Sequence, residues 1–237
     1  MKLLCRARFG GTVGETMAAM RRRPTFVAAA IVLVCVAGCS RTVGGSAVVA
    51  SESRDLATIP LPELMLEPSA FPPEYPATSL DAGAAQSALA LVEGVPPGGR
   101  VTPPECQPAA APRQIAAMEG VHGDTTLRVM LARGVGPLSA RRDQVAWCST
   151  FSVTTDTNGS WDVSAQLLPP PVLDVDDAFA VEQTQTGSGV FGGLALVGQV
   201  SEVRVIAQLT GLPGQQLDTA VLDQVFAAAV QKVRHAA

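Results

Sequence analysis

The stretch STFSVTTDTNGSWDVSAQL, residues 149–167, is the clearest structural unit in this chain of 237 residues. Apolar side chains occupy every second position on both sides of DTNG: Phe151, Val153, Trp161, Val163, Ala165 and Leu167. A period of two residues is typical of half-buried β-strands. The Asn158–Gly159 pair tolerates the positive φ angles of a tight hairpin turn. The stretch therefore predicts an antiparallel β-hairpin.

Further strands are predicted on both sides of this hairpin. Residues 125–133 alternate Leu127, Val129 and Leu131 with Arg128 and Met130. Residues 189–211 are rich in Val, Leu and Gly and predict two strands, with a turn near Gly198 or Ser201–Glu202. Prolines in residues 69–83 and 92–108 favour extended or turn structure, because proline fixes φ and removes a hydrogen-bond donor.

An amphipathic helix is predicted at the end of the chain, where residues 217–233 have an apolar side chain at every fourth position: Leu217, Val221, Val225, Ala229 and Val233. Three shorter stretches are candidate helices: Ala84–Val92, Arg113–Glu119 and Asp174–Gln183. Strands followed by a closing helix favour an α+β fold. We expect an antiparallel sheet of about four to five strands, packed by the C-terminal amphipathic helix and one or two shorter helices.

The beginning of the chain has the features of an export signal. Residues 20–39 read MRRRPTFVAAAIVLVCVAGC, with three arginines, a short apolar run and small residues at the end. The run is too short for a comfortable transmembrane helix, which needs about 20 residues. VAGC resembles the signal-peptidase box of bacterial lipoproteins, which implies that Cys39 becomes the first mature residue and carries diacylglycerol. The alternative is an uncleaved signal anchor in which this cysteine is incidental.

Three regions follow from this interpretation. Residues 1–38 form a signal peptide, whose true start is Met17 or Met20. Residues 39–67 are small, polar and proline-bearing, which suits a lipidated flexible tether. Residues 68–237 form a single α+β domain. Acyl chains on Cys39 would hold this domain at the cell membrane, on the extracytoplasmic face, since several chains together give stable anchoring.

Two cysteines, Cys106 and Cys148, remain outside the leader and the anchor. Export to an oxidising compartment favours a disulfide between them. A metal site and a catalytic thiol are the alternatives. A metal site would need more His or Cys at short spacing, and the chain has only His122 and His235.

No motif for catalysis or for binding a cofactor stands out. His122 lies near Asp124, so a base oriented by a carboxylate is conceivable, although a loop histidine beside a turn is commoner. Asp174–Asp177 lacks the glycine and the glutamate of a calcium loop and reads as acids at a helix start. Arg141–Arg142 reads as a solvated face. We expect no catalytic residue, no cofactor and no metal ligand.

The charge distribution argues against nucleic-acid binding. The total formal charge is −4, and six basic residues against one acid precede Cys39, which leaves −9 for the rest of the chain. Affinity for nucleic acids depends largely on Lys and Arg contacts to phosphates, so an acidic mature domain is a poor candidate.

Several short motifs resemble a known group of proteins: the VAGC box, FPPEYP at 71–76, PPEC at 103–106 and WC at 147–148. Together they resemble mycobacterial cell-envelope lipoproteins of a domain-of-unknown-function family. A looser likeness is to the extracellular sensor domain of mycobacterial serine/threonine kinases, which implies an α+β fold with a ligand-sized cleft. That domain has two disulfides, whereas this mature chain has cysteines for one.

Three functional hypotheses follow. The first is a non-catalytic, lipid-anchored envelope protein that binds an apolar small molecule, a lipid, a glycan or an envelope protein. Its lipid-binding version predicts an apolar pocket between the sheet and the helix at 217–233. The second is a sensor or scaffold domain that acts through protein contact and exposes an apolar or aromatic patch. The third is a hydrolase that uses His122.

Overall fold

The computed structural model describes residues 55–109, 111–157, 159–187 and 191–237. The predicted signal peptide at 1–38, Cys39 and most of the predicted tether lie outside the described residues, as does Asn158 of the hairpin turn.

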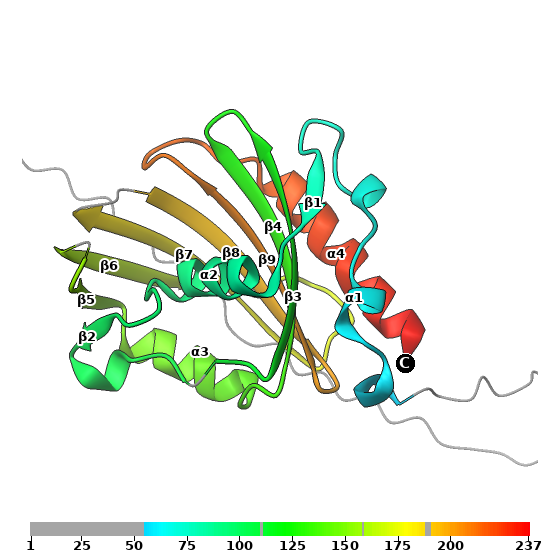
Figure 1. The fold of residues 1–237 in the computed structure, drawn as a ribbon, viewed down its shortest axis with the longest axis horizontal. Coiled ribbons are helices and arrows are strands. Elements are labelled where there is room, and N and C mark those ends of the chain that lie inside the picture. The colour runs from blue at the N-terminus through cyan, green and yellow to red at the C-terminus, as the bar shows by residue number, and fades with distance from the viewer. Residues whose placement is uncertain (1–54, 110, 158, 188–190) are drawn as a thin grey trace, which may run out of the picture. The chain divides into compact units, whose positions relative to one another are not determined.

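One antiparallel sheet organises the described residues, with nine strands in the order β1-β3-β4-β9-β8-β7-β6-β5-β2 (Figure 1). The strands are β1 (Ala77–Ser79), β2 (Arg100–Thr102), β3 (Gln114–His122), β4 (Thr125–Arg133), β5 (Thr150–Thr155), β6 (Gly159–Leu168), β7 (Asp177–Gly187), β8 (Phe191–Val200) and β9 (Val203–Gly211). The predicted α+β class, the antiparallel sheet and the hairpin at residues 149–167 are confirmed. The prediction of four to five strands is wrong.

The four strands that sequence analysis missed fall into two groups. The first group, β1 and β2, lies at the two edges of the sheet. Each strand has three residues, which is too few to show the two-residue alternation of a strand. The second group, β3 and β7, lies where helices were predicted at Arg113–Glu119 and Asp174–Gln183. Both strands are paired on two sides, and this pairing overrides a weak helical preference of their alanines.

In the described part of the chain, four α-helices pack on the sheet: α1 (Leu61–Leu64), α2 (Ala82–Glu93), α3 (Leu138–Trp147) and α4 (Thr219–Ala236). The predicted helices at Ala84–Val92 and at the C-terminus correspond to α2 and α4 and are confirmed. Asp81 caps α2 by accepting a hydrogen bond from the Ala84 amide at 2.8 Å, and Asp218 caps α4 in the same way. Sequence analysis missed α3.

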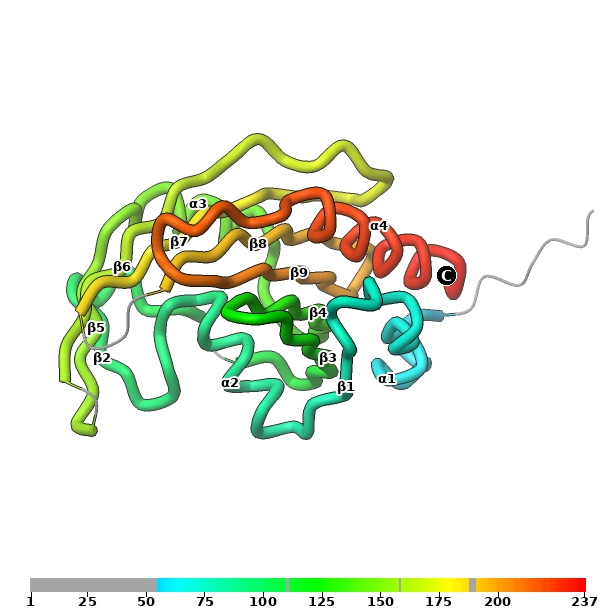
Figure 2. Tube along the Cα trace, turned by 90° about the horizontal axis from the view of Figure 1, so that it is seen from above, coloured from blue at the N-terminus to red at the C-terminus, as the bar shows by residue number. Residues whose placement is uncertain are grey.

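The two faces of the sheet are covered by different helices. Figure 2 shows α4 and α2 on opposite sides of β9 and β4. Under α4 the core is filled by fully buried side chains: Leu127, Val129, Val205, Ala207, Leu209, Leu222, Phe226 and Val233. The lipid-binding hypothesis predicted a pocket between this helix and the sheet. That prediction is wrong, because closely packed side chains occupy the space.

The segment before residue 68 also joins this core. Leu56, Leu61 and Leu64 are at most 3% exposed and belong to the same cluster as α4. The Arg133 guanidinium donates hydrogen bonds to the carbonyl oxygens of Leu56 at 2.6 Å and Ile59 at 3.1 Å. The packed domain thus includes residues that the sequence assigned to the tether.

Candidate ligand pocket

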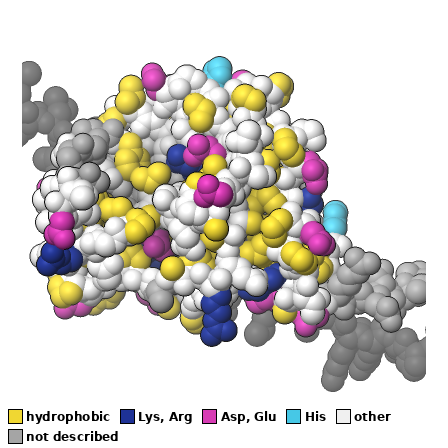
Figure 3. Space-filling view, viewed as in Figure 1, with side chains coloured by type: hydrophobic (Ala, Val, Ile, Leu, Met, Phe, Trp, Pro, Cys, Tyr) yellow, Lys and Arg dark blue, Asp and Glu magenta, His cyan; other side chains and the backbone are white. Residues whose placement is uncertain are grey.

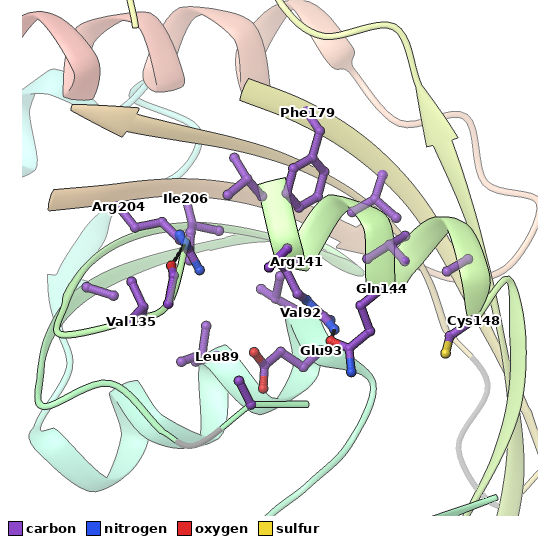
Figure 4. Close-up of a pocket in the computed structure, with 18 of the residues that line it drawn as sticks. Leu89, Val92, Glu93, Val135, Arg141, Gln144, Cys148, Phe179, Arg204 and Ile206 are labelled. Carbon is purple, nitrogen blue, oxygen red and sulfur yellow. Dashed lines mark hydrogen bonds between the residues drawn. The ribbon is translucent and has the colours of Figure 1, made fainter. Parts of the chain in front are cut away.

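A cavity of about 390 Å³ lies between α2, α3 and the face of the sheet opposite α4 (Figure 4). Its volume falls within the roughly 300–1,000 Å³ that is usual for small-molecule sites. The walls are mostly apolar, with side chains from both helices and from strands β7 and β9 among them: Leu89, Val92, Val145, Phe179, Val181 and Ile206. Figure 3 shows hydrophobic side chains gathered on this hollowed face, interrupted by a few charged groups.

Strand register explains which side chains reach the cavity. Ile206 of β9 pairs with Val197 of β8, and Val197 pairs with Phe179 of β7, so all three point to the same face. Arg204 lies two residues before Ile206 and therefore shares that face. The alternation that buries Val203 and Val205 under α4 thus sends one charged side chain into the cavity.

Gly94 sets the position of the end of α2. It adopts a φ of +74°, and a Cβ atom built there would lie 2.4 Å from Nε2 of Gln183 on β7. A residue with a side chain would be strained in this left-handed conformation, and its Cβ would press against the side chains of Gln183 and Val163. Glycine therefore lets α2 end close to β7, which places Glu93 at the cavity.

Arg204 is the most buried charged residue of the cavity, with 8% of its surface exposed. Its Nη2 donates a hydrogen bond to the Gly136 carbonyl oxygen at 2.6 Å. Its Nε is buried and has no hydrogen-bond partner among the described residues. None of the ion pairs in the described residues includes Arg204.

Arg141 of α3 is the second cation and is held by a chain of hydrogen bonds. Its Nη1 donates to Oε1 of Gln144 at 2.7 Å. The Gln144 amide nitrogen in turn donates to the carbonyl oxygens of Gln107 at 2.7 Å and Glu105 at 3.3 Å. Since both donors of Gln144 are used, its oxygen is left to face Arg141.

The predicted disulfide fastens the same region. The structure joins Cys106 and Cys148, whose Cα atoms are 5.5 Å apart. The bond ties the segment that carries the Glu105 and Gln107 carbonyls to the end of α3. It therefore fixes the partners that orient Gln144.

Glu93 supplies the negative charge of the cavity. Burial raises the pKa of Glu93 above its ordinary value, and the nearby charges of Arg141 and Arg204 oppose this shift only in part. The same burial lowers the pKa of Arg141 and of Arg204. Among the described residues, no hydrogen bond or ion pair within 4.0 Å engages the Glu93 carboxylate. Figure 4 shows Glu93 on the same side of the cavity as Arg141 and Gln144.

A second, shallower depression lies on the other face of the sheet, over β5, β6 and β7. Hydroxyl groups and one carboxylate line most of it: Thr102, Thr150, Ser152, Asp162, Ser164, Thr184 and Thr186. The Ser152 hydroxyl donates a hydrogen bond to Asp162 at 2.6 Å, so part of this polar surface is already satisfied internally. It offers little apolar surface for a ligand.

The other residues singled out from the sequence lie away from the cavity. His122 is exposed at the turn between β3 and β4, and its ring lies 5.6 Å from that of Tyr75. Asp176 pairs with Arg234 at 2.9 Å, and Asp177 pairs with Arg142 at 2.6 Å. No group of three or more potential metal ligands occurs in the part of the chain that the structure describes. Neither His122 nor the aspartates are brought into the pocket.

The large apolar side chains that are exposed come from several elements: Leu91, Val121, Trp147, Val172 and Leu212. Trp147, at the end of α3, is 89% exposed and is the most prominent aromatic group among them. It adjoins Cys148, which lines the cavity.

Sequence analysis missed the charged residues of the pocket. Arg141 was interpreted as part of a solvated face, and Glu93 was not singled out. Arg204 carried a usable signal, because it is the one charged residue in the apolar run Val203–Leu209. A charge inside a strand buried on both faces is rare unless it is paired or functional.

The fold and the pocket together define an α+β domain, in which two helices cover an amphipathic cavity on an antiparallel sheet. No helix among the described residues is both long enough and apolar enough to cross a membrane.

Comparison with known proteins gives structural neighbours. No family model matches the chain, and no curated protein matches it. A solved structure of an uncharacterized protein from Mycobacterium smegmatis is similar, with 17% identity and a TM-score of 0.47, over 77% of this chain and 98% of that one. The extracellular domain of PknH from Mycobacterium tuberculosis is also similar, with 14% identity and a TM-score of 0.44, over 72% of this chain and 97% of that one. Both neighbours are mycobacterial proteins, as are the proteins that the sequence motifs resemble.

Proposed function

We propose that this is a non-catalytic binding domain that takes a small, largely apolar ligand into the cavity beneath α2 and α3. The observation that carries the proposal is the cavity itself, with a volume of about 390 Å³ and mainly apolar walls. The side chains around an apolar space of this size lack van der Waals contacts on one side unless a ligand fills the space.

The polar groups of the cavity support the same function. The side-chain oxygen of Gln183 is buried and has no hydrogen-bond partner among the described residues, like Nε of Arg204. Buried polar atoms are nearly always satisfied, so unpartnered atoms that face a cavity are candidates for contacts with a ligand or with ordered water. Few and fixed polar groups in an apolar pocket give a ligand its orientation.

The proposal is tested by closing the mouth of the cavity. Ala140 is exposed on α3 and lines the cavity, so Ala140→Trp should fill the opening without disturbing the core. We expect the neutral fluorescent probe N-phenyl-1-naphthylamine to bind the wild-type domain and to bind Ala140→Trp at least about tenfold more weakly, as titration of fluorescence would measure.

A matched control is available on the same helix. Ala146 is also exposed but does not line the cavity, so Ala146→Trp should bind the probe as the wild type does. Equal loss in both variants, or no binding by the wild type, would contradict the proposal.

The location of this domain is part of the proposal. The lipoprotein signal predicted from the sequence would attach acyl chains to Cys39 and hold the domain on the extracytoplasmic face of the cell membrane. A pocket with apolar walls at that location suits a ligand that comes from the envelope.

A further inference from the structure

We infer that the ligand of this cavity carries one oxyanion head group, a carboxylate or a phosphate, and that Arg204 and Arg141 bind it. This inference rests on the proposed function and specifies the class of ligand. The ligand is a single-chain amphiphile, with its chain against the apolar walls and its head at the two guanidinium groups.

The burial of Arg204 is the first argument. A charged side chain that is more than nine-tenths buried is normally paired, because an unpaired buried charge is costly. Arg204 has only the Gly136 carbonyl as a hydrogen-bond partner, and its Nε has none among the described residues. Of the acids near it, Asp177 is already bound by Arg142 at 2.6 Å. An anion from outside the chain would complete this site.

The balance of charge is the second argument. Two cations, Arg204 and Arg141, face the cavity with one carboxylate, Glu93. Two guanidinium groups against one carboxylate leave the cavity with an excess of positive charge, and burial, which raises the pKa of Glu93, weakens the opposing negative charge. A cationic head group would be repelled by this excess, and a neutral head group would leave it uncompensated.

The fixed positions of the donors are the third argument. The Gly136 carbonyl orients Arg204, and the Gln144 oxygen orients Arg141. Gln144 is itself held by the Gln107 carbonyl, next to the disulfide at Cys106. Guanidinium groups that are oriented before binding lose little entropy when an oxyanion arrives.

The apolar walls distinguish an amphiphile from a free anion. Most of the cavity is lined by aliphatic and aromatic side chains, such as Leu89, Val181 and Phe179, which offer nothing to inorganic phosphate or acetate. Each methylene group buried there adds affinity. The same head group should therefore bind far more tightly when it carries an alkyl chain.

The test compares ten-carbon amphiphiles that share one chain and differ in head group. Isothermal titration calorimetry of the wild-type domain would use decanoate, decyl phosphate, decan-1-ol and decyltrimethylammonium, all below micelle formation, with acetate and inorganic phosphate alongside. We expect decanoate or decyl phosphate to bind at least about tenfold more tightly than decan-1-ol, as hydrogen bonds to charged groups would give. The stronger of the two identifies the head group as carboxylate or phosphate.

Substitutions assign the effect to named side chains. Arg204→Gln and Arg141→Gln should each reduce affinity for the preferred anion by about tenfold or more and leave that for decan-1-ol unchanged. Glu93→Gln should raise affinity for the anion several-fold, because it removes the competing carboxylate, and a misfolded variant could not show such a gain. If Arg204→Gln does not fold, Arg204→Lys replaces it in the test, because lysine keeps the positive charge at this position. Arg100→Gln is the matched control, since Arg100 is exposed and pairs with Asp156 outside the cavity.

The possible outcomes separate this inference from the proposed function. Equal binding of decanoate, decyl phosphate and decan-1-ol would overturn the oxyanion site and leave the apolar cavity standing. Preference for decyltrimethylammonium would overturn it as well, since Glu93 would then dominate. If inorganic phosphate bound as tightly as decyl phosphate, the amphiphile would be excluded. If neither the amphiphiles nor the neutral probe bound, the proposed function itself would fail.

Discussion

At the scale of single residues, the ionisation of Glu93 links the pocket to the stability of the domain. Burial raises the pKa of Glu93 above its ordinary value of 4.5, so the folded protein binds this proton more tightly than the unfolded chain does. The free energy of unfolding therefore falls as pH rises from the ordinary pKa to the raised one. The protein carries this penalty at neutral pH and is free of it below the ordinary pKa.

The variant Glu93→Gln removes the penalty, and its effect should depend on pH. We expect a higher free energy of unfolding than the wild type at pH 7, and no difference below about pH 4, where the wild-type carboxyl is protonated in both states. Urea titrations at both pH values would measure this. A variant that is less stable at pH 7 would show that Glu93 is compensated by its arginine neighbours and that burial does not dominate.

The sequence held one usable signal for the pocket residues. Arg204 interrupts an apolar strand and could have been recognised as a buried charge. Arg141 could not, because its neighbour Arg142 is bound to Asp177 near the surface and the pair RR looks uniformly solvated. Only the position of α3 over the sheet separates their roles, and that position depends on contacts between residues far apart in the sequence.

At the scale of secondary-structure elements, the failed helix predictions have a common cause. Residues 114–122 and 177–187 contain alanine and other tolerant residues, so local preference is weak. Each segment is flanked in the sheet by two strands, with partners such as β4 and β8 that are strongly apolar. The hairpin at 149–167 was predictable because its period and its turn both lie within one short stretch. Where pairing with neighbouring strands decides, the local pattern of the segment itself shows little of it.

The disulfide connects two elements of the pocket, and its removal should affect both stability and binding. The double variant Cys106→Ser/Cys148→Ser opens a loop that spans 42 positions. We expect the free energy of unfolding to fall by about 3–4 kcal/mol in the chain-entropy model. We also expect the double variant to lose more affinity for decanoate than for decan-1-ol. Gln144 would lose its fixed partners in the Gln107 segment, and Arg141 would therefore lose its orientation.

Denaturant unfolding and calorimetry, below the unfolding transition, would measure the two effects. Reduced wild-type protein is the control and should behave as the double variant does. An unchanged preference for the anion in a folded double variant would show that α3 holds Arg141 without help from the disulfide.

At the scale of the whole molecule, the two faces of the sheet have separate roles. The face under α4 is filled by side chains that are fully buried, such as Val129, Leu209 and Phe226, and it supplies most of the core. The opposite face leaves a cavity under two helices and concentrates buried charge there. This division allows the cavity to be amphipathic without weakening the core under α4, since the buried charged groups of the cavity lie on the other face of the sheet.

The last prediction concerns Cys39 and separates anchoring from binding. If Cys39 is acylated, protein from its own membrane should have a mature N-terminus at Cys39, with the added mass of several acyl chains by mass spectrometry. Several chains hold a protein stably in a bilayer, whereas one gives marginal attachment. Cys39→Ala should therefore abolish acylation and membrane retention. Its domain from Asp55 onward should still bind N-phenyl-1-naphthylamine as the wild type does, because every residue that lines the cavity lies beyond residue 88. If Cys39→Ala stayed in the membrane fraction, the result would point instead to an uncleaved signal anchor. If Cys39→Ala lost probe binding, the result would show that the pocket depends on the lipidated N-terminus.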